Sequence, residues 1–81
     1  MLYREVFSIR LKKARKAAGE QQVELAQAVG ISQTGISAIE NGKQATSIDN
    51  LAVICQHYNI SADYFLGLID EPRPLKKEGA Q

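Results

Sequence analysis

Between Gln22 and Lys43, polar side chains are spaced so that they could hydrogen-bond to the edges of DNA bases. The segment predicts two short helices joined by a tight turn. Ile36 and Ile39, three residues apart, direct one stripe of the second helix inward. The polar side chains left on its outer face are those of Gln33, Thr34 and Ser37. That face could enter a major groove.

The turn between these two helices has residues suited to a close helix crossing. Ala26 is small enough to let the two helices approach each other, and Gly30 can adopt the positive φ of a turn at little cost. Ser32 can cap the second helix through its hydroxyl. The first helix has no such cap, because Glu20 and Gln21 stand at its start, which predicts a weak beginning.

Length and composition restrict the class of protein. The 81 residues, 44% hydrophobic and 6% aromatic, predict one small, aliphatic, all-α domain. The single cysteine excludes an internal disulfide and a cysteine-based zinc site. No stretch has the length of a membrane span or the pattern of a signal peptide, so we expect a cytoplasmic protein. No catalytic set of side chains is visible, and we expect no enzyme activity, metal, cofactor or small-molecule ligand.

A run of five cations precedes the segment from Gln22 to Lys43, although the net charge of the chain is only +1. The run comprises Arg10, Lys12, Lys13, Arg15 and Lys16. It is interpreted either as a solvated helix face or as a strip that contacts phosphates. We include Arg10 among the predicted phosphate contacts.

Periodicity and capping residues predict five helices and no strand. The expected helices cover residues 4–18, 22–29 and 33–41, a segment from Ser47 to Asn59, and a short segment after Ser61. From residue 70 the chain has two prolines, charged residues and little hydrophobicity. We therefore predict a domain over residues 1–69 and a polar tail over residues 70–81.

These five short helices resemble the lambda-repressor-like (Cro/repressor, Xre-type) helix-turn-helix family. The resemblance covers residues 7–68 and rests on RLKKARKAAG, QVELAQAVGISQTGISAIENGK and SIDNLAVICQHYNISADYFLG. It implies a compact five-helix DNA-binding domain with the helix-turn-helix on the second and third helices. The implied function is a transcriptional regulator of bacterial or phage type, a repressor, that binds double-stranded DNA with the third helix in the major groove.

The resemblance also implies roles for individual residues. Arg15 and Glu40 match residues that pair between the first helix and the end of the third. The implied base contacts are Gln33, Thr34 and Ser37. The implied phosphate contacts are Gln22, Asn41 and Lys43. A glutamine amide can bond adenine N6 and N7 together, which suits Gln33 to this role.

Several residues depart from the family pattern. Gly35 and Ala38 replace longer side chains on the third helix, which has no arginine or lysine to read guanine. A glycine at position 35 indicates either a close approach of another group or a replacement without effect. Two alternatives to a repressor therefore stay open: an antitoxin or restriction-system controller of the same fold, or a protein-interaction module that has lost DNA binding.

Apolar residues near the end of the chain suggest self-association. Tyr64 with Leu68, and Phe65 with Ile69, lie at helical spacing on two stripes. A chain this small cannot bury both stripes, so one is expected to face the core and the other a second copy. The aromatic residues are interpreted either as core alone or as part of a dimer contact. We predict a weak homodimer that binds an inverted repeat in DNA, with these four residues as its contact.

Overall fold

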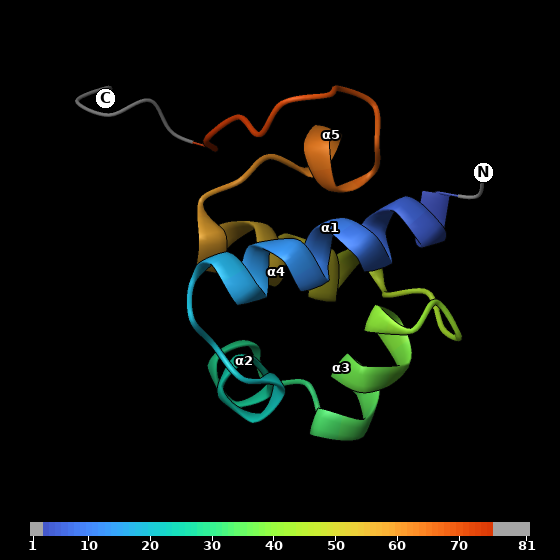
Figure 1. Ribbon diagram of the computed structural model, residues 1–81, viewed down its shortest axis with the longest axis vertical. Coiled ribbons are helices and arrows are strands. Elements are labelled where there is room, and N and C mark those ends of the chain that lie inside the picture. Colours follow the sequence, from blue (N-terminus) through green and yellow to red (C-terminus); the bar gives the residue numbers. More distant parts are fainter. Residues whose placement is uncertain (1–2, 76–81) are drawn as a thin grey trace.

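The computed structural model describes residues 3–75, which contain five helices. They are α1 (Tyr3–Ala17), α2 (Gln22–Val29), α3 (Gln33–Glu40), α4 (Ile48–Tyr58) and α5 (Ala62–Phe65). No strand occurs in this part of the chain, so the predicted all-α, five-helix architecture is confirmed. In Figure 1, α1 crosses the middle of the molecule, with α5 above it and α2 and α3 below it.

The starts of three helices show how local hydrogen bonds set the helix boundaries. Ser32 Oγ accepts from Gly35 N at 3.0 Å, and Ser47 Oγ accepts from Asn50 N at 3.0 Å, as the cap residues predict. The start of α2 is better held than predicted, because Glu24 Oε1 accepts from Gln21 N at 2.8 Å. A glutamate at this position satisfies a helix N-terminal N–H group that would otherwise lack a partner.

The turn between α2 and α3 has the predicted form. Gly30 has φ +74°, and its N–H donates to Ala26 O. Ala26 is buried in the core. α3 ends at Glu40, one residue earlier than predicted, because Asn41 leaves helical geometry with φ −90° and ψ 2°.

Every helix contributes to one hydrophobic core. The largest side chains with less than 2% exposure are Leu11, Leu25, Ile36, Ile39, Ile54 and Phe65. Full burial of such a side chain contributes about 1.5–3 kcal/mol, so this core dominates the stability of the domain. Phe7 and Phe65 meet edge to face, with ring centroids 5.7 Å apart, and join α1 to α5. The core therefore fixes α2 and α3 against α1 and α4.

The predicted dimer contact is wrong at two of its four residues. Tyr64 is 6% exposed and Phe65 is 0% exposed, so both belong to the core of the single chain. α5 stops after Phe65, and Gly67 turns the chain with φ +80°. Helical spacing therefore does not extend to residues 68 and 69. Leu68 is 61% exposed, whereas Ile69 is partly buried against the core.

Gly67 occupies a position that excludes a side chain. A Cβ there would lie 2.8 Å from Val6 Cγ1, so the turn after α5 packs directly on α1. Its positive φ adds a second reason for glycine.

The segment after this turn folds back along α5. Ser61 N donates to Arg73 O at 2.7 Å, and the Arg73 guanidinium pairs with Asp63. Figure 1 shows this segment passing beside α5. Of the predicted polar tail, residues 76–81 lie outside the described part of the chain, as do residues 1–2 of the predicted domain. None of the described helices is long and apolar enough to cross a membrane.

Candidate nucleic-acid interface

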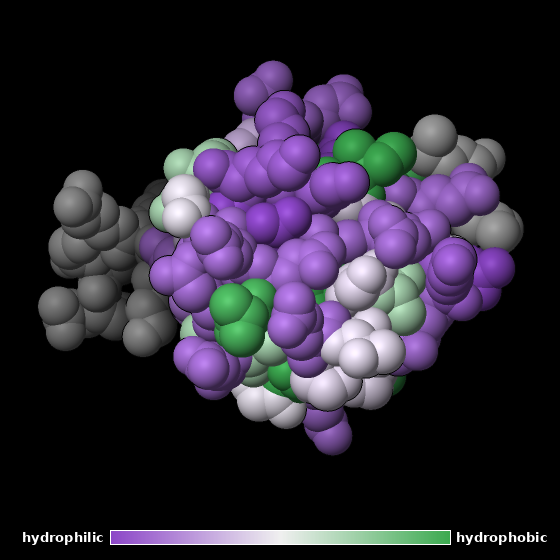
Figure 2. Space-filling model, turned by 60° about the horizontal axis from the view of Figure 1, so that its bottom comes forward, coloured by the Kyte–Doolittle hydropathy of each residue, from purple (hydrophilic) through white to green (hydrophobic). Residues whose placement is uncertain are grey.

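A groove of about 430 Å³ opens along the outer face of α3. It is lined by Gln22, Gln33, Thr34, Ser37, Ala38, Asn41 and Lys43. These include all three predicted base contacts and three of the four predicted phosphate contacts. Figure 2 brings the side of α2 and α3 forward and shows a mainly hydrophilic surface with few strongly hydrophobic side chains. The fold thus gathers the predicted hydrogen-bonding residues in one place.

The groove offers hydrogen-bonding groups rather than charge. Gln33 and Thr34 are exposed in the first turn of α3, and Ser37 lies about one turn further along. Asn41 Nδ2 donates to Ser37 Oγ at 3.5 Å, a long bond that leaves both side chains available to a ligand. Lys43 is the one cation in the lining.

Gly35 lies in the first turn of α3 and packs against the turn before the helix. A Cβ at this position would lie 3.0 Å from Ile31 Cγ2 and 3.1 Å from Ser32 Oγ. A side chain would therefore crowd the residue that caps α3. Of the two explanations that the sequence allowed, the close approach is the one that the structure supports.

Arg15 and Glu40 form a buried ion pair between α1 and the end of α3. Arg15 Nε lies 2.7 Å from Glu40 Oε2, and Nη2 lies 3.0 Å from Oε1. The two side chains are 9% and 0% exposed. The hydrogen bond to Glu40 raises the pKa of Arg15 against the opposing effect of burial. Such a two-pronged pair fixes the geometry of α3 against α1.

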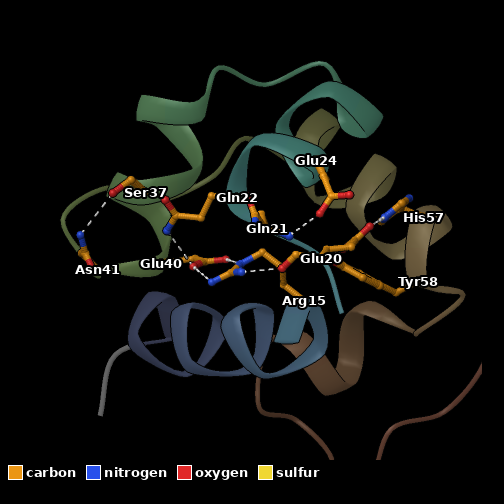
Figure 3. A network of polar contacts seen from close by, with 10 residues as sticks. All are labelled: Arg15, Glu20, Gln21, Gln22, Glu24, Ser37, Glu40, Asn41, His57 and Tyr58. Carbon is orange, nitrogen blue, oxygen red and sulfur yellow. Dashed lines mark hydrogen bonds and ion pairs between the residues drawn. The ribbon is translucent and has the colours of Figure 1, made fainter. Parts of the chain in front are cut away.

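Gln22 extends this ion pair into the groove (Figure 3). Its Nε2 donates to Glu40 Oε1 at 3.1 Å. A carboxylate only accepts hydrogen bonds, so the amide must present its nitrogen to Glu40. The second N–H and the Oε1 of Gln22 remain for other partners.

A second polar cluster joins α4 to the turn between α1 and α2. Glu20 accepts a hydrogen bond from Tyr58 Oη and lies 2.6 Å from His57 Nε2. Glu20 therefore lies before α2 and binds to α4. No sequence pattern indicates this contact, because His57 is 37 residues away.

The contacts in this cluster shift the pKa values of Glu20 and Tyr58. Burial opposes ionisation of Glu20, but hydrogen bonds from Tyr58 and His57, with the charges of His57 and Arg15, lower its pKa overall. Burial, together with the hydrogen bond to Glu20, raises the pKa of Tyr58. Arg15 Nη1 also donates to Glu20 O at 2.7 Å, which connects this cluster to the ion pair (Figure 3).

Arg10 does not lie with the other predicted phosphate contacts. Its Nη1 donates to the carbonyl oxygens of Tyr64 and Ile69, the latter at 2.7 Å. Its guanidinium carbon lies 4.3 Å from the centroid of the Tyr64 ring. The structure thus assigns Arg10 to holding α5 and the following turn on α1, and the prediction of a phosphate contact is withdrawn.

Two helices crossing at a glycine turn, with a polar groove on the second helix, define a helix-turn-helix protein. A family model described as helix-turn-helix matches residues 11–65. The chain therefore belongs to this family, of the Xre or lambda-repressor-like type.

Sequence relatives and a solved structure agree with this assignment. Over 65 residues the chain is 34% identical to the uncharacterized HTH-type transcriptional regulator YobD of Bacillus subtilis, covering 80% of this chain and 58% of that one. It is 34% identical to the antitoxin PezA of Streptococcus pneumoniae, covering 80% of this chain and 39% of that one. The crystal structure of the clp gene regulator ClgR from Corynebacterium glutamicum superposes with a TM-score of 0.75 at 30% identity, covering 82% of this chain and 70% of that one. The chain thus spans 58% and 39% of the length of these two curated relatives.

Proposed function

We propose that the protein is a transcriptional regulator, acting as a repressor, that binds a specific sequence in double-stranded DNA. The observation that carries the proposal is the groove on α3, where six predicted contact residues meet. The outer face of α3 is polar and free of the core, which suits insertion into a major groove. The similarity to YobD and ClgR supports the same function.

The side chains in the groove favour particular bases. The Gln33 amide can donate to N7 and accept from N6 of adenine, and the Thr34 methyl can pack on the methyl of thymine. α3 has no arginine or lysine for bidentate contact with guanine. We therefore propose that recognition at this helix favours A·T pairs.

Contacts to phosphates would position α3 rather than read sequence. Lys43 supplies charge at the end of the groove, and Asn41 supplies amide donors beside it. The free N–H of Gln22 can donate to a phosphate oxygen, while its other N–H stays on Glu40. This orientation depends on the buried Arg15–Glu40 pair.

We further propose that two copies bind an inverted repeat, because one small module reads only a few base pairs. The aromatic residues of α5 are buried and cannot form the contact. Of the other two predicted residues, Leu68 is exposed and Ile69 is partly buried, so Leu68 is the one to test. The proposal also places the protein in the cytoplasm and gives it a binding role rather than a catalytic one.

A second candidate function is that of an antitoxin, which the similarity to PezA favours. An antitoxin of this fold would also bind a toxin protein. Expression of the chain together with the product of its neighbouring gene would separate the two functions. If the product of the neighbouring gene is toxic and the chain rescues growth, the protein acts as an antitoxin. If that product is harmless, the protein acts as a transcriptional regulator alone.

Binding to duplex DNA at several salt concentrations tests the proposed function. Fluorescence anisotropy with a labelled duplex of mixed sequence should show an affinity that falls steeply with salt, since bound phosphates release counterions. The protein-interaction module predicts no such binding. Absence of salt-dependent affinity for any duplex would therefore replace a DNA-binding function with that alternative.

A further inference from the structure

Between Arg10 and Lys16, the cations of α1 divide into two inward arginines and three outward lysines. Arg15 is bound to Glu40, and Arg10 is bound to the carbonyls of Tyr64 and Ile69. The other cations of this run are Lys12, Lys13 and Lys16, all of which are exposed. We refer to these three residues as the lysine strip.

The lysine strip lines a groove of its own. With Ile9 and Glu40, the three lysines line a shallow, open groove of about 460 Å³. Spacings of three and four residues place the lysines on one face of the helix. The Glu40 side chain is 0% exposed and already bound to Arg15 and Gln22, so its charge does not neutralise the strip. Among residues 3–75, no ion pair involves any of the three lysines.

Stability of the fold does not account for this arrangement. Lys16 lies in the last turn of α1, where a cation favours the helix dipole. Lys12 and Lys13 precede that turn and gain little from it, because the dipole effect falls off within one turn. Like charges at these spacings also repel each other. A bound polyanion would offset this repulsion, because each lysine would be attracted to its negative charges.

The lysine strip lies beside the groove on α3. Glu40 lines the lysine groove, and the next residue, Asn41, lines the groove on α3. Ser8 Oγ donates to Ile39 O, which ties α1 to the same end of α3. A ligand that fills the groove on α3 and extends past Asn41 would therefore reach the lysines.

We propose that the lysine strip is a second phosphate-binding surface, which holds the DNA backbone that flanks the segment read by α3. The proposal rests on the proposed function. A row of adjacent cations suits duplex DNA, which carries one negative charge per about 1.7 Å of helix axis. The strip adds affinity for any sequence and leaves base preference to the groove on α3.

The salt dependence of duplex binding tests this proposal. The variants are K12Q, K13Q, K16Q and the triple variant, measured with a duplex of mixed sequence. R4Q is the matched control, since it removes one charge from an exposed arginine of the same helix away from the strip. Because all of these side chains are exposed, thermal melting followed by circular dichroism should show unchanged folding.

The slope of log affinity against log salt is negative. We expect each lysine variant to reduce its magnitude by about 0.9, and the triple variant by two to three times this amount. R4Q should keep the wild-type slope. A triple variant with the wild-type slope would overturn the proposal while the proposed function stands. If R4Q and K12Q change the salt slope equally, the proposal is also overturned, because the change then reflects total charge rather than contact at the strip. A wild type without salt-dependent binding would remove both this proposal and the proposed function.

Discussion

The amide nitrogen of Gln22 lies 3.1 Å from Oε1 of Glu40, the carboxylate that Arg15 holds from α1. One contact thus joins a residue of the candidate DNA interface to a buried ion pair. The outer groove and the core are therefore coupled, and changes to the ion pair should alter both stability and binding.

Arg15→Ala and Glu40→Ala should each lower the free energy of unfolding by about 3 kcal/mol, because each leaves a buried charge without its partner. The double variant should cost less than the sum of the two. Chemical denaturation of all four proteins measures the coupling. Lys16→Ala, at an exposed neighbouring position, serves as a control with little effect. Simple additivity would show that the two charges do not stabilise each other.

Glu20 should make the stability depend on pH. Its pKa is lowered from 4.5 in the folded protein, so its contribution is present above that pH and is lost as the pH falls through the lowered value. Glu20→Gln should therefore destabilise the protein at neutral pH, and the difference from wild type should shrink in acid. Thermal melting over a series of pH values measures this difference.

Glu24→Gln provides the comparison for Glu20, because Glu24 is exposed and accepts its hydrogen bond from Gln21 N rather than from a cluster on α4. It should change stability less at neutral pH. A constant gap between wild type and the Glu20 variant at all pH values would argue against an ionisation effect.

Gln33→Ala should weaken binding to the selected sequence by roughly 1–3 kcal/mol and leave affinity for unrelated duplexes nearly unchanged. The reason is its exposed position in the first turn of α3, within the groove. Competition binding with selected and scrambled duplexes gives both affinities. Equal losses on the two duplexes would assign Gln33 to the phosphates.

Lys43→Ala should instead weaken binding to all duplexes alike and reduce the salt slope by about one. It is the cation of the α3 groove and follows the turn that ends the helix. Titrations at several salt concentrations give the slope. An unchanged slope would place Lys43 away from the DNA backbone.

Local patterns account for what could be predicted from the sequence. Ser32, Ser47 and Gly30 mark helix ends through bonds to near neighbours, and their roles are as expected. The α3 groove was also predictable, because its lining falls within the contiguous segment 22–43. The prediction of a domain boundary after residue 69 stays a prediction.

The family resemblance implied the long-range pair of Arg15 and Glu40, but other long-range polar contacts could not be predicted. Arg10 binds carbonyls 54 and 59 residues away, and every residue has a carbonyl, so no residue type marks the acceptor. The contact of Glu20 with His57 likewise depends on how α4 packs. The dimer prediction was wrong at Tyr64 and Phe65 because it continued α5 past Gly67, although that glycine is a signal for a helix end.

Selection of bound duplexes from a random pool tests the central claim, that the groove on α3 reads a DNA sequence. The wild type should enrich one motif, rich in A·T pairs and repeated in inverted orientation, and a variant with both Gln33→Ala and Thr34→Ala should lose the enrichment while it still retains duplexes at low salt. A pool that stays random with the wild type, or the same motif enriched by the double variant, would contradict the claim.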